Sequence, residues 1–478
     1  MPSAQSLNLE LGSRALIRPP QAGLASGVPS NPMLPAGFTY LGQFIAHDIS
    51  SHRFTDSSNI PTLRLKNLYG AGSAMCPYLY VHYSGDLGET GSQPAPNDDL
   101  YFFKGIKLKL RRKFAKTRYV YDVHRTVEGL PLMADARNDQ HFIISQLHVA
   151  FIRFHNAVVD FVVLNKPGIT PSILARTARA LVIAHYQYIL VNHYVKSLVE
   201  SPTLVGSLLR SKKNFVLFNV DEAPRLMPEF ADAVLRLGHS QVAEIYLFPE
   251  QKFIYHEDAK KDLRGFKDRF KGNNLLEMDW AFFFEVEDNS KNVQPSSAID
   301  YNLVAPMGGI PFYAQDKRDI SIRDIDLSHQ IPLGLEYAHF LARVKQDPTI
   351  PLSLQELRSV KGFDTADLER VPLWLYILLE AQIRHKGYKL GPLGSQIIAE
   401  QLIWVLRSDP LSFLNMPNFL PEEAFAEWRT FPEKLKIKIP YETTGQEIDL
   451  PFGIHDLLQF PDYFNKKIAV ERPIFNHS

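Results

Sequence analysis

The stretch HFIISQLHVAFIRFHNAVVDFVVLN, residues 141–165, carries the strongest helical signal in the chain. Large apolar side chains recur in it at steps of three and four residues, which places them on one face of an α-helix: Ile144, Leu147, Phe151, Phe154, Val158 and Phe161. The polar residues His148, His155, Asn156 and Asp160 leave that stripe. The pattern predicts a long and largely buried helix.

The segments around this helix are also mostly helical in pattern. A second helix is predicted from Pro171, because Thr170 can act as its N-cap and proline suits the first turn. Further helical patterns cover residues 227–243, 332–344, 372–385 and 393–406, whereas strand signals are few. Residues 1–36, with scattered proline, glycine and serine, predict an extended arm. We therefore expect a mainly α protein with few short strands, in which residues 37–478 form a single large helical domain.

The composition argues against several classes of protein. With 478 residues, of which 45% are hydrophobic, the chain can bury a large core. Acidic and basic residues are equal in number, 52 of each, so the chain lacks the overall excess of positive charge that is typical of a nucleic-acid binder. The lone Cys76 rules out an internal disulfide and a cysteine-based zinc site, which fits a reducing compartment. The first residues do not resemble a signal peptide, and we expect no membrane span. These features predict a cytoplasmic protein.

The stretch YLGQFIAHD, residues 40–48, places Gln43 and His47 one helical turn apart. Side chains at this spacing share a helix face. An imidazole that titrates near neutrality can accept a proton while a neighbouring amide orients a bound molecule, so the pair suits a small polar substrate such as a peroxide. Taken alone, the pair is better explained by a core histidine near a helix start.

An arginine stands at the entrance of the long helix, in the segment ADARNDQ, residues 134–140. A fixed guanidinium at Arg137 could stabilise negative charge as an O–O bond breaks. The alternative is a surface arginine that pairs with Asp135 or Asp139 at a helix cap.

The segment LRLGHS, residues 235–240, places Arg236 one turn before His239. The glycine just before His239 would let a flat ligand approach the backbone closely. Arg236 could then pair with an acidic group on that ligand. The alternative is a histidine satisfied within the core.

These motifs, in this order, resemble those of the animal-type haem peroxidase superfamily, also called the peroxidase-cyclooxygenase superfamily. Residues 38–48 resemble the family's distal-histidine motif, 136–156 its distal-arginine helix and 235–240 its proximal-histidine motif. The bacterial branch in particular is matched by residues 295–311, 372–376 and 390–394. The resemblance implies a single helical domain that holds haem b. It also implies a peroxidase that reduces hydrogen peroxide and oxidises an organic or halide donor through a ferryl intermediate.

The resemblance implies a role for each matched residue. His239 would bind the iron on the proximal side and leave the distal position open for peroxide. His47 would move a proton between the two peroxide oxygens, while Arg137 would stabilise the charge that develops as their bond breaks. Gln43 would order the distal water or the substrate, and Arg236 would pair with a haem propionate.

The chain departs from the family at the positions that hold haem covalently and at the calcium site. Ala46 and Gln140 stand where members with ester-linked haem have carboxylates, so we expect non-covalent haem b. Asp48 matches the family's calcium-binding aspartate, but the loop that would supply further oxygens holds Arg64 and Lys66. A cation beside two cationic side chains is unfavourable. We therefore expect no calcium, and a pairing of Asp48 with Arg64 or Lys66.

Two residues are assigned only by register from the segment 333–335. Asp326 falls where the family has an asparagine that accepts a hydrogen bond from the iron-bound histidine, and a carboxylate there would make His239 more anionic. The alternative is that Asp326 caps a turn or pairs with Arg323. By the same register His329 stands where the family often has a propionate-binding arginine.

Two other functions compete with a peroxidase. A haem-dependent oxygenase of the cyclooxygenase type, acting on a lipid or a biosynthetic intermediate, would need a radical-forming tyrosine at the position of Arg236 and would lack Arg137. A non-catalytic haem-binding protein is supported by the lost ester and calcium positions, but the retained Gln43, His47 and His239 argue against it. We expect hydrogen peroxide and a small reducing substrate as partners, and no nucleic acid.

Overall fold

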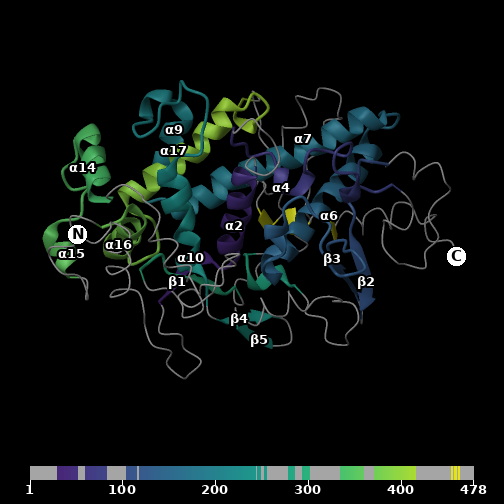
Figure 1. The fold of residues 1–478 in the computed structure, drawn as a ribbon, viewed down its shortest axis with the longest axis horizontal. Coiled ribbons are helices and arrows are strands. Elements are labelled where there is room, and N and C mark those ends of the chain that lie inside the picture. The colour runs from purple at the N-terminus through teal and green to yellow at the C-terminus, as the bar shows by residue number, and fades with distance from the viewer. Residues whose placement is uncertain are drawn as a thin grey trace, which may run out of the picture. The chain divides into compact units, whose positions relative to one another are not determined.

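Helices dominate the part of the chain that the computed structural model describes (Figure 1). The described residues are 29–51, 60–82, 104–115, 118–243, 245–248, 252–255, 278–285, 293–301, 334–359, 371–415, 454–455, 457–459 and 461–462. The prediction of a mainly α protein with few short strands is confirmed. The division into an N-terminal arm and one domain from residue 37 stays a prediction.

The chain forms two compact units, and each is built from several segments. The first unit comprises Met1–Ala46, Tyr194–Asp258 and Asp279–Ser408. The second unit comprises His47–His193, Ala259–Met278 and Asp409–Ser478.

The second unit is built around the helix predicted from residues 141–165. This helix, α6 (Phe142–Asn165), begins after His141, whose imidazole nitrogen accepts the Ile143 N–H at 3.2 Å. Helix α7 (Pro171–Ile189) packs along it, with the Phe151 and Tyr186 rings edge to face at 5.9 Å between centroids. Both sequence-based helix predictions are confirmed.

Helix α6 also bears on the expectation that the chain has no membrane span. Its segment Phe142–Leu164 is long and apolar enough to cross a bilayer by length and composition, which the sequence analysis did not anticipate. In the folded chain 72% of its most apolar window is buried against the protein. Core helices of soluble proteins pass the same test, so the segment is weak evidence for a membrane span.

Shorter elements surround α6 and α7 in the second unit. The strands β2 (Arg111–Ala115) and β3 (Arg118–Asp122) form an antiparallel hairpin. The remaining short helices of this unit are α4 (Lys66–Tyr69), η1 (Pro77–Leu79), η3 (Ala136–Asp139) and η12 (Phe413–Asn415). The π-helix η4 (Leu190–Val195) follows α7 and runs from the second unit into the first.

The core of the first unit is the helix pair α16 (Leu373–His385) and α17 (Pro392–Ser408), which confirms two further predicted helices. The buried carboxylate of Glu380 accepts the backbone N–H groups of Leu393 and Gly394 at 3.1 and 3.2 Å, where α17 begins. A carboxylate at a helix N-terminus satisfies donors that have no intrahelical partner.

The other elements of the first unit pack around this pair. Helix α14 (Gly334–Lys345) contacts α16, and α9 (Pro202–Arg210) contacts α17. Two antiparallel strand pairs are β1 (Ser30–Pro35) with β6 (Pro295–Ser297), and β4 (Ile245–Phe248) with β5 (Lys252–Tyr255). The short helices are α8 (Lys196–Leu198), η5 (Lys212–Asn214), η9 (Trp280–Phe282) and α15 (Leu354–Arg358).

The segment 227–243 is helical, as predicted, but it is not one α-helix. It divides into the π-helix η6 (Glu229–Ala233), the 3₁₀-helix η7 (Val234–Leu237) and the short α10 (Gly238–Gln241). The backbone of Ala233, at φ −121° and ψ −74°, leaves the helical region between the first two pieces. The hydrophobic periodicity therefore identified the helical character and missed the break.

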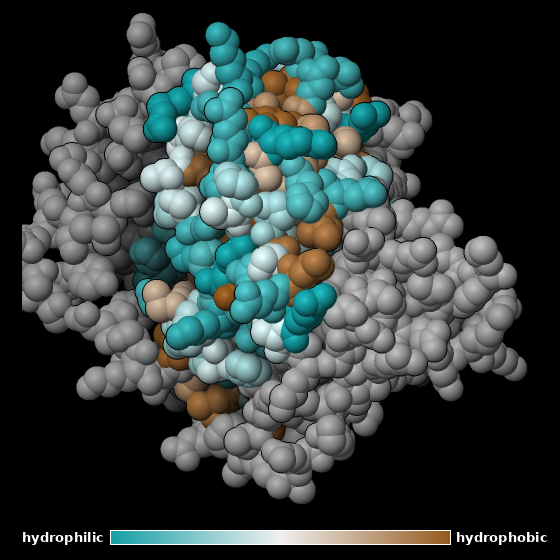
Figure 2. Space-filling view, turned by 90° about the vertical axis from the view of Figure 1, so that its left-hand side faces the viewer, coloured by the Kyte–Doolittle hydropathy of each residue, from teal (hydrophilic) through white to brown (hydrophobic). Residues whose placement is uncertain are grey.

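The surface over the side of Figure 1 where α14 and α15 lie is largely hydrophilic, with separate hydrophobic groups (Figure 2). On these two helices Phe340, Val344 and Leu354 are exposed. Scattered exposed apolar side chains are normal for a globular protein.

Candidate functional site

Helix α2 (Gly37–Ser50) carries the Gln43 and His47 pair predicted from the sequence. Its apolar residues Leu41, Phe44, Ile45 and Ile49 are fully buried, and this burial fixes the helix. Gln43 is half-buried in the first unit, and His47, which opens the second unit, is 8% exposed. The two side chains lie one turn apart on one helix, as expected.

His47 is held through one ring nitrogen. Its Nδ1 lies 2.7 Å from Oδ1 of Asn138, which is fully buried on η3. The pKa of His47 is lowered to about 4, first by burial and then by the neighbouring Arg137 charge, and these effects outweigh Asn138 and Asp135, which raise it. The imidazole is therefore neutral at neutral pH and able to accept a proton.

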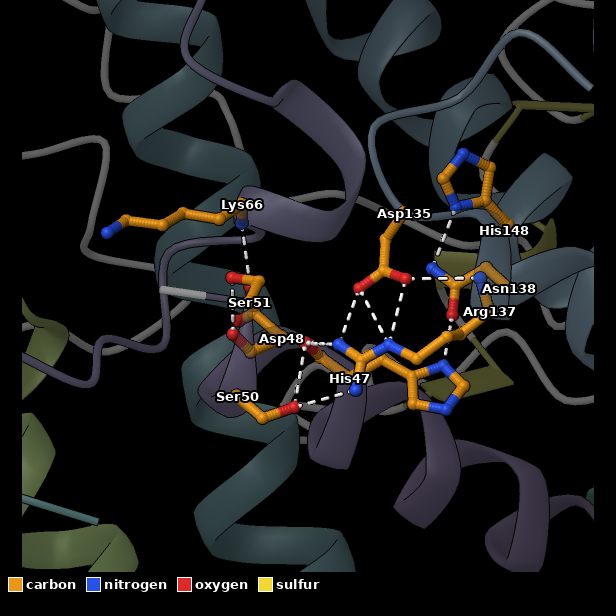
Figure 3. Close-up of polar contacts among 9 residues, drawn as sticks. All are labelled: His47, Asp48, Ser50, Ser51, Lys66, Asp135, Arg137, Asn138 and His148. Atoms are coloured by element: carbon orange, nitrogen blue, oxygen red, sulfur yellow. Dashed lines mark hydrogen bonds and ion pairs between the residues drawn. The ribbon is translucent and has the colours of Figure 1, made fainter. Parts of the chain in front are cut away.

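Arg137 contacts the end of α2 on which His47 lies (Figure 3). Its Nη2 donates to the His47 carbonyl and its Nη1 to Ser50 Oγ, both at 3.0 Å. Its Nε and Nη2 also donate to the Asp135 carboxylate, at 2.9 and 2.6 Å. A guanidinium at this position satisfies carbonyl groups at the helix C-terminus and interacts favourably with the helix dipole.

The pairing of Arg137 with Asp135 is the alternative that the sequence analysis set against a role for Arg137 in breaking an O–O bond. The other candidate partner, Asp139, bonds a different arginine. Because the Asp135 carboxylate neutralises much of the Arg137 charge, the role of Arg137 in stabilising charge on a substrate stays a prediction.

Sequence reasoning missed Arg125, which fixes the short helix η3. Its guanidinium donates to both oxygens of Asp139 at 2.8 Å and to both oxygens of Asp122 at 2.9 and 3.2 Å. The Arg125 side chain is only 3% exposed, and those of Asp122 and Asp139 are 2% and 9% exposed. The only signal in the sequence was an aspartate three residues before an arginine, which is too common to indicate a site.

The Asp48 carboxylate is bound differently from the sequence-based expectation. Its oxygens accept the backbone N–H groups of Leu65 and Lys66 at 3.0 and 2.6 Å. The side chain of Arg64 instead forms a bidentate ion pair with Asp409. The expected pairing of Asp48 with a cationic side chain is therefore wrong, because the left-handed backbone of Leu65 turns main-chain donors toward the carboxylate. The pKa of Asp48 is raised to about 7, because burial outweighs the backbone N–H groups and the Tyr186 hydroxyl, which lower it.

The proximal candidates Arg236 and His239 lie in the first unit, on η7 and α10. Both side chains are half-buried, and Nη2 of Arg236 lies 3.7 Å from an oxygen of Asp232. A Cβ added at Gly238 would meet no heavy atom of the described residues within 4 Å. The approach of a flat ligand at Gly238 stays a prediction.

For the remaining predicted positions, the structure gives at most the exposure of the side chain. Ala46 is half-buried and Gln140 is exposed. Asp326, His329 and Arg323 lie outside the described residues. No group of histidine, cysteine and acidic side chains within the described part of the chain is arranged to hold a bare metal ion.

Comparison with protein families and curated proteins points to one family. Residues 91–296 match the family model for animal haem peroxidase, a span that includes Arg137 and His239 but begins after His47. The chain is 24% identical to Heme peroxidase 2 of Caenorhabditis elegans over 316 residues, 60% of this chain and 41% of that protein. It is 29% identical to Chorion peroxidase of Drosophila melanogaster over 339 residues, 65% of this chain and 39% of that protein. The matches thus span about two fifths of these relatives' lengths.

Solved structures share the fold at low sequence identity. Peroxidase A from Dictyostelium discoideum superposes with a TM-score of 0.51 and 13% identity, covering 89% of each chain. A fatty acid alpha-dioxygenase from Arabidopsis thaliana gives a TM-score of 0.58 and 13% identity, covering 98% of this chain and 75% of that one. At this identity the likeness concerns the fold alone.

Proposed function

Because residues 91–296 match the family model for animal haem peroxidase, we propose that the chain is a member of this family that binds haem b and reduces hydrogen peroxide while oxidising a small organic or halide donor. The observation that carries this proposal is the buried, neutral imidazole of His47, held by Asn138 beside the Arg137–Asp135 pair. A neutral, fixed imidazole is the group that proton transfer on a peroxide requires.

The proximal candidates have a task of their own in this proposal. Haem would supply the iron at which peroxide is reduced, with His239 as its protein ligand and Arg236 as a partner for a propionate. The open space beside Gly238 supports this use of the segment. Asp326 would accept a hydrogen bond from His239, and His329 would lie near a propionate.

The distal residues would transfer one proton between the two oxygens of the peroxide. Nε2 of His47 takes the proton of one peroxide oxygen and returns it to the other oxygen, which leaves as water. The Arg137 guanidinium, whose charge Asp135 partly neutralises, would favour the negative charge that develops between the oxygens. Gln43, one turn away on α2, would orient the bound molecule.

The cofactor would be held without ester bonds or calcium. Ala46 and Gln140 lack carboxylates. Backbone N–H groups, which repel a cation, surround the Asp48 carboxylate where calcium would need oxygen ligands.

A spectrum of the purified protein tests the proposal directly. We expect a Soret band that shifts on adding hydrogen peroxide and returns when a phenol or halide is supplied. An absent band, or a band that peroxide leaves unchanged, would support a non-catalytic protein. Consumption of dioxygen with a fatty acid, without peroxide, would support the oxygenase.

The mode of haem attachment follows from Ala46 and Gln140. Acidified organic solvent should extract unmodified haem b, and the mass of the remaining polypeptide should equal that of the chain alone. A haem adduct on the polypeptide would contradict the prediction. Elemental analysis of the same preparation should find no stoichiometric calcium.

Removal of the proposed iron ligand should abolish the native haem complex. His239→Ala should lower the haem content or give an altered Soret band, because the protein bond to iron is gone. The exposed His339 on α14 offers a matched control, and His339→Ala should keep the parent spectrum. A His239→Ala protein with an unchanged spectrum would place the iron ligand elsewhere.

A further inference from the structure

A chain of hydrogen bonds joins two histidines through one amide (Figure 3). Nδ1 of His47 lies 2.7 Å from Oδ1 of Asn138, and Nδ2 of Asn138 lies 3.1 Å from Nδ1 of His148. The three residues come from α2, η3 and α6, and they are 8%, 0% and 2% exposed. His47 lies 91 residues before Asn138 in sequence, so the three residues meet only in the folded unit.

The Asn138 amide determines which ring nitrogen of each histidine carries a proton. The Asn138 oxygen can only accept a hydrogen bond, so Nδ1 of His47 must carry the proton that is donated. The Asn138 nitrogen can only donate, so Nδ1 of His148 must be the acceptor. A neutral imidazole has one N–H, and Nε2 of His47 is therefore left with a lone pair.

Burial keeps both imidazoles in the neutral form that this argument requires. It lowers the pKa of His148 to about 4, as it does for His47. Asp135 is the acidic neighbour that acts on both rings, and its carboxylate is held by Arg137.

We propose that Asn138 is a positioning residue that holds His47 in the tautomer with a basic Nε2, and that His148 fixes the orientation of the Asn138 amide. This inference rests on the proposed function, in which Nε2 accepts the peroxide proton. A reversed amide would place its N–H₂ against Nδ1 of His47, move the ring proton to Nε2 and leave no base facing the peroxide. The hydrogen bond to Asn138 uses Nδ1 of His47 and leaves Nε2 for the peroxide proton.

The tautomer can be read without any catalytic turnover. Histidine labelled with ¹⁵N is introduced into the protein, which is loaded with diamagnetic zinc protoporphyrin, and His47→Ala identifies the His47 signals. We expect the parent protein to carry the proton on Nδ1 of His47. In Asn138→Leu, which has a similar volume and no polar atoms, the proton should move to Nε2, the tautomer that a neutral histidine favours in water.

In the haem-loaded variants, the rate of reaction with peroxide should change together with the His47 tautomer. In Asn138→Leu the rate of reaction with peroxide should fall about 10- to 100-fold, the range found when a metal-bound histidine loses the partner that orients it. Asn138→Asp keeps an acceptor and adds a charge, so it should keep the Nδ1 tautomer and move the acid limb of the pH profile upward. A merely structural role would not produce this shift.

Histidines on α6 provide matched variants. His148→Leu should move part of the His47 population to the Nε2 tautomer. His155 is equally buried on the same helix but bonds Tyr69 and the Ile106 carbonyl, so His155→Leu should leave the tautomer of His47 unchanged. Thermal midpoints of all variants separate unfolding from a local change.

Two results would overturn the inference. One is a parent protein whose His47 carries its proton on Nε2, and the other is an Asn138→Leu protein with an unchanged tautomer. A parent protein that binds no porphyrin, or whose haem complex ignores peroxide, would instead refute the proposed function, and the tautomer would still be measurable in the purified chain.

Discussion

His47→Ala should keep its haem and react with hydrogen peroxide about 10²- to 10⁴-fold more slowly than the parent protein, the range expected when a general base is removed. The proposed iron ligand, His239, lies on another element and is untouched by the change. Stopped-flow mixing with peroxide, followed through the Soret band, measures the rate. An unchanged rate would show that the base lies elsewhere.

The environment of His47 also predicts how this reaction depends on pH. An ordinary histidine with a pKa of about 6.5 would lose its basic lone pair as the pH falls through that value. Because the pKa of His47 is lowered to about 4, the ring stays neutral down to about that pH. The rate should therefore be insensitive to His47 above about pH 5 and decline as the pH falls through 4.

A buried histidine outside the site provides the control for His47→Ala. The pKa of His155 is also lowered to about 4 by burial, and its ring bonds Tyr69 at 3.0 Å. His155→Ala should lower the thermal midpoint but leave the peroxide rate of the folded protein near that of the parent. A similar loss of rate in both variants would mean that His47→Ala acts through stability.

Periodicity in the sequence predicted the long elements because a buried helix face repeats along the chain itself. The predicted span 141–165 became α6 from Phe142 to Asn165, and 372–385 became α16 from Leu373 to His385. The segment 227–243 shows the limit of this signal. Its apolar spacing is helical, yet the backbone breaks at Ala233, which no side-chain pattern marks.

The candidate site was predictable only where its residues lie near one another in sequence. The spacing of Gln43 and His47 indicated a shared helix face, and the segment around Arg137 indicated a fixed charge. Asn138 stood beside Arg137 in the same motif, but its two histidine partners come from separate helices. Two partners of Asp48 are the backbone N–H groups of Leu65 and Lys66, and backbone groups leave no trace in the residue types.

Arg125→Leu should destabilise the second unit by about 3–5 kcal/mol, because it leaves two buried carboxylates without their shared cation. Burial alone would lower the pKa of Arg125, yet Asp139 and Asp122 raise it above its usual range, so the arginine is charged in the fold. Without it, Asp122 and Asp139 would repel each other in a desolvated position. Chemical denaturation followed by far-ultraviolet circular dichroism measures the loss.

The effect should concentrate at η3, since Asp139 lies on this helix together with Arg137 and Asn138. Amide hydrogen exchange over residues 122–145 should quicken in Arg125→Leu, and the peroxide rate should fall as the two neighbouring side chains lose their positions. Arg125→Lys should recover only part of the stability, because an ammonium cannot bond two carboxylates in the bidentate manner of a guanidinium.

An exposed ion pair supplies the control for Arg125. The side chains of Lys212 and Asp221 pair at 3.2 Å but are 57% and 79% exposed, so Lys212→Ala should change the stability by no more than about 1 kcal/mol. If Arg125→Leu were as mild as Lys212→Ala, the triad would not anchor η3. The orientation of Arg137 and Asn138 would then have to come from their contacts with α2 and α6 alone.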